Sequence, residues 1–298
     1  IFGSADMDSI STNEFYLKTF ILQISIIGLP PLLYLLYKRV DVSSTIRLNK
    51  IKLKEALLVI GMAIFGYGIV LFINYIWMYL ISFVGPPIPQ PTPPVKSGGN
   101  YIVALICIAI MPAVVEEFLF RGVVLRSYEK MGKKVSVIMS GLLFALLHMN
   151  LASLPSIIFL GIIISYLVQR SDSIISGFLY HFTNNTIAIT IVYISNMVLS
   201  KLDDLAGPAI DDISDMPIET FLAGLIGVGI IALFSLGMFI LCLKAFKRST
   251  EDRALRSHIN ISLARENVRP IEMLPAAAAM VAIGALLVFE VFMMVAMR

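Results

Sequence analysis

Polar residues of this chain fall mainly in short connections between long apolar runs. A helix needs about 20 apolar residues to cross a bilayer, so each run predicts a transmembrane helix, although the fourth and fifth runs are short. Alternating strands of about ten residues, which a membrane barrel needs, are absent. We therefore predict an all-α, polytopic membrane protein with about eight transmembrane helices. The predicted helices are residues 17–37, 56–84, 100–128, 135–150, 154–169, 174–198, 217–243 and 273–297.

The composition supports a membrane location. Hydrophobic residues make up 58% of the 298 positions, charged residues only 14%, and the mean hydropathy is +0.88. Soluble domains carry roughly 25% charged residues, so the composition excludes an ordinary soluble protein. We therefore expect the lipid bilayer as a partner and no nucleic acid.

The connections alternate in charge along the chain. Four of them are rich in Lys and Arg, and the connections between these carry few or no basic residues. The positive-inside rule then places the basic connections in the cytoplasm and both termini outside, and we expect a bacterial cytoplasmic membrane. Residues 41–54 fit either a segment along the inner membrane surface or a solvated basic loop. The basic connections are residues 38–54, 126–134, 170–173 and 244–271; the others are 85–99, 149–153 and 199–216.

Two carboxylates and an arginine interrupt the third apolar run. Charged side chains at membrane depth are costly and usually functional, so these residues are candidates for chemistry. Glu117 and Arg121 are four residues apart and face each other on a helix, so they can pair. Glu116 is rotated by about 100° from Glu117 and lacks that partner. The pattern indicates one structural carboxylate, Glu117, and one reactive carboxylate, Glu116.

Two further polar clusters lie in later runs. His148 ends the fourth run with Phe144 one turn before it, and His181 and Asn185 lie four residues apart in the sixth run. Such residues more often serve helix packing than catalysis. However, Glu116, His148 and Asn185 are each 13 or 14 residues from the charged residue that ends their span, roughly 20 Å at 1.5 Å per residue. Their shared depth predicts a single site.

The ordered motifs resemble a known family. Glu-Glu-x-x-x-Arg at residues 116–121, Phe-x-x-x-His at 144–148 and His-x-x-x-Asn at 181–185 are similar to those of the CAAX protease and bacteriocin-processing family of intramembrane peptidases, which includes the type II CAAX prenyl endopeptidases. The resemblance covers about residues 100–195. It implies a hydrolase, a membrane endopeptidase of a family often catalogued as metallopeptidases.

The resemblance also implies a role for each motif residue. Glu116 and His148 would activate a water molecule for attack on a peptide carbonyl. His181 and Asn185 would form the oxyanion hole. Glu117, Arg121 and Phe144 would support these side chains.

A metal ion is the main open question about this site. If a divalent metal such as zinc takes part, Glu116, His148 and His181 would be its ligands, whereas an Asn ligand would be unusual. Removal from water also makes a carboxylate a better proton acceptor, which suits a general base. We therefore favour a mechanism that requires no cofactor.

These observations divide the chain into three regions. Residues 1–99 hold two spans, a basic cytoplasmic loop and a proline-rich outer loop. Residues 100–198 hold four spans that form the catalytic helix core, and residues 199–298 hold two more spans.

Two other functions remain open. The first is a non-catalytic membrane regulator or scaffold of the same fold. The second is an ion-coupled transporter, which would need the intramembrane carboxylate Glu290 in the last span. For the peptidase, we expect a peptide or membrane-tethered protein substrate; the sequence leaves its prenylation, the side of entry and the oligomeric state open.

Overall fold

The computed structural model describes residues 11–88, 95–202, 216–263 and 274–297, and every regular element in these ranges is a helix. The predicted all-α class is therefore confirmed. The α-helices are α1 (Thr12–Leu22), α2 (Leu29–Tyr37), α3 (Val42–Thr45), α4 (Leu53–Ser82), α5 (Gly98–Ala104), α6 (Met111–Glu117), α7 (Leu125–Tyr128), α8 (Lys133–Leu147), α9 (Leu154–Ser171), α10 (Ile174–Leu202), α11 (Ile218–Ser249), α12 (Glu251–Leu263) and α13 (Leu274–Ala296). The shorter elements are the π-helical segments η2 (Gln23–Gly28), η3 (Leu105–Ile110) and η4 (Phe118–Val124) and the 3-10 turns η5 (Glu129–Met131) and η6 (Leu151–Ser153).

Six helical stretches among the described residues are long and apolar enough to cross a membrane. The predicted count of eight is not confirmed, because α8 and α10 are not among them. Helix α8 has only 15 residues, and the middle of α10 carries His181, Asn184 and Asn185. Both exceptions are helices that carry predicted site residues. The six stretches are Thr12–Tyr37, Leu53–Ser82, Gly98–Met131, Leu151–Ser171, Ile218–Ser249 and Ala277–Ala296.

Two of the π-helical segments lie just before prolines. Segment η2 is followed by Pro30 and Pro31 in the first turn of α2, and η3 is followed by Pro112 in the first turn of α6. A proline cannot donate a backbone hydrogen bond to the carbonyl four residues before it. The wider π turns accommodate this missing bond within otherwise continuous helices.

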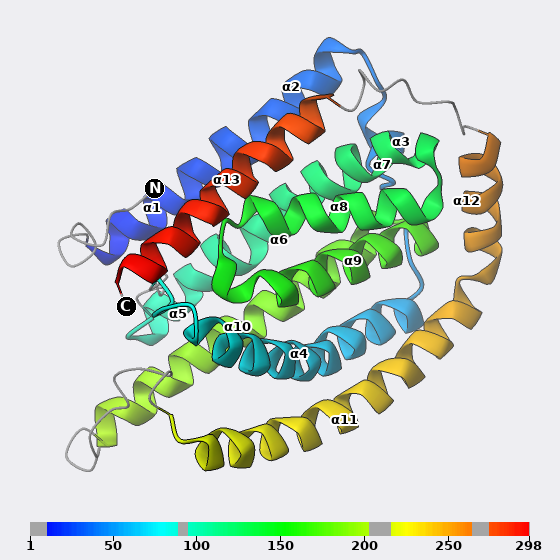
Figure 1. Cartoon of the computed structure of the whole chain (residues 1–298). Coiled ribbons are helices and arrows are strands. Elements are labelled where there is room, and N and C mark those ends of the chain that lie inside the picture. The colour runs from blue at the N-terminus through cyan, green and yellow to red at the C-terminus, as the bar shows by residue number, and fades with distance from the viewer. Residues whose placement is uncertain (1–10, 89–94, 203–215, 264–273, 298) are drawn as a thin grey trace.

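Helices α8 and α9 are packed backbone to backbone in the centre of the bundle (Figure 1). A Cβ atom on Gly141 would lie 2.7 Å from the backbone nitrogen of Ile162, and one on Gly161 would lie 2.7 Å from the carbonyl oxygen of Gly141. Only glycine permits this approach. Helix α4 packs against α9, α10 and α11, so the flanking regions lie directly on the central helices (Figure 1).

The described parts of the four basic connections meet at one end of the bundle, where α12 lies across the ends of the other helices (Figure 1). Arg47 donates from Nη2 to Glu129 Oε2 at 2.6 Å and from Nε to Asp172 Oδ1 at 2.8 Å. Arg170 Nη2 donates to the carbonyl oxygen of Lys247 at 2.6 Å. If basic and non-basic connections alternate along a bundle of spans, the basic ones must lie at the same end. The side of the membrane that this end faces stays a prediction.

Most residues of the segment 41–54 are exposed, but Arg47 is buried between two other connections. The segment contains the short helix α3 and the first two residues of α4, and its position along the membrane surface or in solvent stays a prediction. The sequence could not show the burial of Arg47, because both of its carboxylate partners lie more than 80 residues away.

Glu290 tethers the last span near the other end of the bundle. Its Oε2 accepts a hydrogen bond from the backbone N–H of Leu151 at 3.2 Å, and Trp77 Nε1 donates to the carbonyl oxygen of Leu151 at 2.7 Å. The residue that the transporter hypothesis needs is thus bound to a backbone turn. Residues 89–94 of the predicted proline-rich outer loop lie outside the described residues.

Candidate active site

Glu117 is held through one oxygen by two polar partners, and its Oε2 is buried without a hydrogen-bond partner among the described residues. Its Oε1 accepts hydrogen bonds from Arg121 Nη1 at 2.8 Å and from His181 Nδ1 at 3.0 Å. Arg121 is fully buried, donates from Nη2 to the carbonyl oxygen of Gly161 at 3.1 Å, and lies 4.5 Å from the ring centre of Phe144. The expected Glu117–Arg121 pair is present, and it joins η4 to α9 and α10.

Gly177 of α10 has no side chain, and this leaves space for the Glu117 carboxylate. A Cβ atom at this position would lie 2.4 Å from Glu117 Oε2 and 2.7 Å from a methyl carbon of Val168. The second oxygen of Glu117 is therefore pressed against the backbone of α10.

Glu116 points the other way, toward α1–α2 and the end of α8. Its Oε1 accepts a hydrogen bond from Gln23 Nε2 at 3.0 Å, and its Oε2 lies 4.0 Å from His148 Nε2. That oxygen is buried and has no hydrogen-bond partner among the described residues. The sequence-based view of Glu116 as unpartnered is wrong for one oxygen and correct for the other.

The tautomer of His148 follows from its other nitrogen. His148 Nδ1 lies 2.9 Å from the carbonyl oxygen of Phe144, which can only accept, so Nδ1 carries the ring proton. In the neutral ring, Nε2 then carries a lone pair that points toward Glu116. Two proton acceptors thus stand 4.0 Å apart, too far for a direct hydrogen bond.

His181 has the same tautomer for a different reason. Its Nδ1 donates to the carboxylate of Glu117, and its ring packs edge-on against Phe144 with centroids 5.6 Å apart. In the neutral ring Nε2 is an acceptor, so donation to an oxyanion through Nε2 requires the doubly protonated ring.

Asn185 has a structural partner. Its Nδ2 donates to the carbonyl oxygen of Ile108 at 3.1 Å. Ile108 lies in the π-helical segment η3, just before Pro112, whose nitrogen carries no proton to donate. Asn185 therefore adds a donor to a carbonyl oxygen beside Pro112, and its second N–H is the one left for an oxyanion.

A cavity of ≈ 410 Å³ brings the predicted residues together. Glu116, His148, His181 and Asn185 all line it, and Phe144 forms part of its wall. Glu117 and Arg121 lie behind that wall and support it. Several lining polar atoms are buried without a hydrogen-bond partner among the described residues. These atoms are Gln23 Oε1, Asn74 Oδ1, Glu116 Oε2 and Asn184 Oδ1.

Sequence reasoning missed Gln23 and Asn74. Both are polar residues inside the first two apolar runs, a signal that could have found them. Their position in the cavity depends on how α2 and α4 pack on the central helices, which no local pattern shows.

The donor set does not fit a three-ligand metal site. Among the described residues, no group of three or more His, Cys, Asp or Glu side chains is arranged to hold a metal ion. Glu116 and His148 supply two donors, and the bond from His181 Nδ1 to Glu117 leaves only the Nε2 of His181 as a third. Catalytic zinc takes three protein ligands, so no step is derived through a metal.

Comparison with known proteins agrees with the motifs. Residues 98–187 match the family model described as type II CAAX prenyl endopeptidase Rce1-like. Comparisons with curated proteins and with solved structures give no match. The matched segment runs from α5 into α10 and contains all seven predicted site residues. The chain therefore carries a type II CAAX prenyl endopeptidase Rce1-like region, which confirms the resemblance that the motifs indicated.

Proposed function

We propose that the chain is an intramembrane endopeptidase that hydrolyses a peptide bond without a metal ion, with Glu116 as the general base. The observation that carries the proposal is the 4.0 Å separation of Glu116 Oε2 and His148 Nε2, two acceptors that face each other at one wall of the cavity. A single water molecule can donate one hydrogen bond to each of them. Its lone pairs then point away from both and are available to attack a carbonyl carbon.

The proton balance of this reaction is simple. As the water oxygen bonds to the carbonyl carbon, Glu116 takes one water proton and the carbonyl oxygen becomes an oxyanion. Glu116 then gives the proton to the leaving nitrogen as the C–N bond breaks, which yields a carboxylic acid and an amine. His148 holds the water in place through Nε2.

His181 and Asn185 are the proposed donors to the oxyanion. His181 is positioned by its hydrogen bond to Glu117, and Asn185 has one N–H beyond its bond to Ile108. Preorganised donors of this kind contribute about 3–4 kcal/mol each in known hydrolases. The substrate class is a hydrophobic peptide or a membrane-tethered protein that can reach a site buried among membrane helices.

Gln23 is the proposed positioning residue for the base. Its amide nitrogen fixes Glu116 Oε1 and so turns Oε2 toward His148. This residue lies outside the Rce1-like segment, so the first span would complete the site.

The proposal is tested by Glu116→Gln and His148→Ala in cells and in proteoliposomes. We expect either variant to accumulate uncleaved substrates that disappear from cells with the intact protein, as measured by comparative peptidomics. Purified protein should then cleave those substrates about 10³-fold faster than either variant. The exposed carboxylate Glu219 gives a matched control, since Glu219→Gln should cleave at the normal rate.

Full activity of Glu116→Gln in proteoliposomes would show that Glu116 is not the general base. A Glu116→Gln strain that keeps the cellular function would instead support the non-catalytic regulator. Gln23→Leu should lower kcat several-fold in the intact protein and have no added effect in Glu116→Gln, because coupled residues are not additive.

A further inference from the structure

The turn between α8 and α9 carries part of the wall of the site cavity. His148 ends α8, and Asn150 and Ser153, later in the same turn, also line the cavity. The His148 side chain is 34% exposed, and its Nδ1 bonds to the carbonyl oxygen of Phe144 in the same helix. Both partners of that bond move with the end of α8. The separation of His148 Nε2 from Glu116 Oε2 therefore depends on how the turn is held.

The backbone of this turn adopts a conformation that its own residues do not favour. Met149, directly after His148, has a φ of 44°, in the left-handed region. Helices often end with a residue in this region, but glycine usually occupies the position, because a Cβ atom makes the conformation unfavourable. Contacts from outside the turn must therefore help to keep it.

Two side chains from distant parts of the chain hold the turn at Leu151, three residues after His148. Trp77 of α4 donates from Nε1 to the carbonyl oxygen of Leu151 at 2.7 Å. Glu290 of α13 accepts from the backbone N–H of Leu151 at 3.2 Å through Oε2. Both backbone groups of one residue are thus bound by side chains that lie 74 and 139 positions away in the sequence.

Glu290 has a cost that this contact helps to explain. It is the one acidic residue in the sequence of α13, a helix that is long and apolar enough to cross a membrane. A carboxylate in such a helix is unfavourable and usually has a partner or a function. Glu290 bonds to the turn and does not line the cavity. Any effect of Glu290 on the site must therefore pass through the turn.

We propose that Trp77 and Glu290 are positioning residues for His148. By holding Leu151 from two sides, they keep Nε2 of His148 directed at Glu116, so that one water molecule can bond to both. The inference rests on the proposed function, because it concerns the side chain that holds the attacking water. It also gives α4 and α13, which lie outside the Rce1-like segment, a part in the reaction.

The kinetic test compares Glu290→Leu and Trp77→Phe with the intact protein in proteoliposomes. Each variant removes one bond to Leu151. We expect kcat to fall about 10- to 100-fold with little change in KM, because a small displacement of a catalytic group is costly. Glu290→Gln should retain most of the rate, since its amide oxygen can still accept from the N–H of Leu151. In a His148→Ala background, Glu290→Leu should lower the rate no further.

A second readout requires no cleavage. The chain has three histidines, so NMR of protein with isotopically labelled histidine nitrogens gives few signals, and His148→Ala assigns those of His148. In the intact protein these signals should show the tautomer with the proton on Nδ1, which donates to Phe144. Glu290→Leu and Trp77→Phe should shift the His148 signals and leave those of His181 unchanged.

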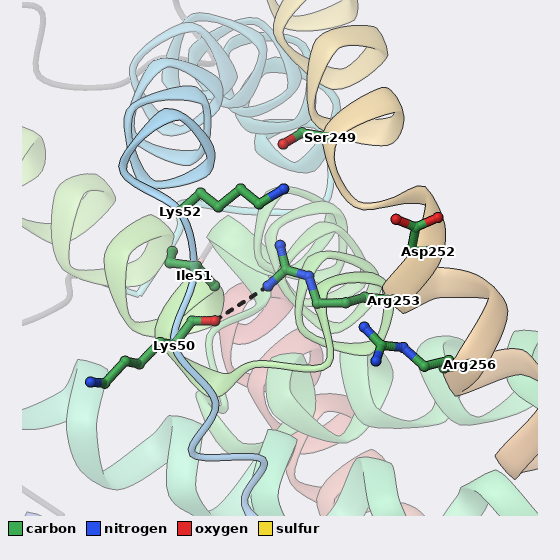
Figure 2. A pocket seen from close by; sticks show the side chains of 7 residues that line it. All are labelled: Lys50, Ile51, Lys52, Ser249, Asp252, Arg253 and Arg256. Atoms are coloured by element: carbon green, nitrogen blue, oxygen red, sulfur yellow. Dashed lines mark hydrogen bonds between the residues drawn. The ribbon is translucent and has the colours of Figure 1, made fainter.

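Hydrogen bonds at the basic end of the bundle, where the basic connections meet, give the matched control. There Glu55 of α4 accepts from Ser249 Oγ at 2.9 Å and pairs with Arg253. Figure 2 shows Arg253 donating to the carbonyl oxygen of Lys50, at 3.4 Å, beside a separate cavity of ≈ 320 Å³. Neither Ser249 nor Arg253 lines the site cavity. Ser249→Ala removes one hydrogen bond to a carboxylate and should leave kcat and the histidine signals unchanged.

Two results would overturn the inference. The first is a normal kcat with unchanged His148 signals in both Glu290→Leu and Trp77→Phe. The second is a loss of rate in Glu290→Gln as large as in Glu290→Leu, because it would show that the charge is needed and not the bond to Leu151. The NMR readout needs no cleavage, so a failure of the proposed function in Glu116→Gln is distinguished from a failure of this inference.

Discussion

Glu116 and Glu117 are adjacent in the chain, yet their surroundings differ in almost every respect. Glu117 shares one oxygen between Arg121 and His181 and presses the other against Gly177. Glu116 has one oxygen held by the neutral amide of Gln23 and the other open toward His148 across a cavity.

The difference between the two sides shows how one helix can carry both a support and a reactive group. A carboxylate that accepts hydrogen bonds from an arginine and a histidine is kept in one position. A carboxylate with a neutral partner and a free oxygen can exchange a proton without breaking an ion pair. The helical repeat alone sends neighbouring residues to these two environments.

The largest expected effect is on stability, at the Glu117 side. Arg121→Met leaves the buried Glu117 without its main partner and should lower the free energy of unfolding by about 3–5 kcal/mol. Thermal unfolding in detergent measures this, with Arg126→Met at an exposed arginine as the control. Glu116→Gln should leave the melting temperature unchanged, and a comparable loss there would remove the distinction between the two carboxylates.

The next largest effect is expected for the loss of His181, which bonds to Glu117 and also lines the cavity beside Glu116. His181→Ala should lower kcat about 10²–10³-fold, because it removes the proposed oxyanion donor. A rate loss that is matched by a loss of folded protein would assign His181 to the Glu117 support alone.

Variants of Asn185 and Pro112 can separate the contribution of Asn185 to stability from its contribution to the cleavage rate. Asn185→Ala leaves the carbonyl oxygen of Ile108 unpaired and should cost about 1–3 kcal/mol of stability. Pro112→Ala supplies a backbone N–H, so the double variant should regain the melting temperature but not the cleavage rate. Recovery of both would mean that Asn185 has no part in the reaction.

The smallest effect is expected at Gly177, behind Glu117. Gly177→Ala should push the carboxylate away from α10 and shift His181, which lowers kcat by about tenfold. Gly237→Ala is the control, because a Cβ atom there meets nothing within 4 Å. Equal rates for the two variants would show that the exact position of Glu117 does not matter.

The sequence predicted those parts of this arrangement that rest on local spacing. Glu117 and Arg121 pair because they are one helical turn apart, and the apolar runs set the helical class. The bond from His181 to Glu117 joins residues 64 positions apart, and that from Gln23 to Glu116 joins residues 93 positions apart. Such contacts depend on how helices pack and on where prolines displace them, which one chain's pattern does not encode locally. Among the described residues, α10 is not counted as long and apolar enough to span because the site itself makes it polar, and α8 is not counted because it has 15 residues.

The π-helical segment η4 sets the rotation between the helix that carries the candidate site and the helix turns at the basic end of the bundle. It lies between Glu117 and α7, and a π turn holds one more residue than an α turn. Because the π turn holds the extra residue, deleting one residue between Gly122 and Val124 would convert it to an α turn and leave Glu129 directed at Arg47. A deletion of one residue should therefore be tolerated better here than in the regular helix α8, where it would rotate the following residues by about 100°.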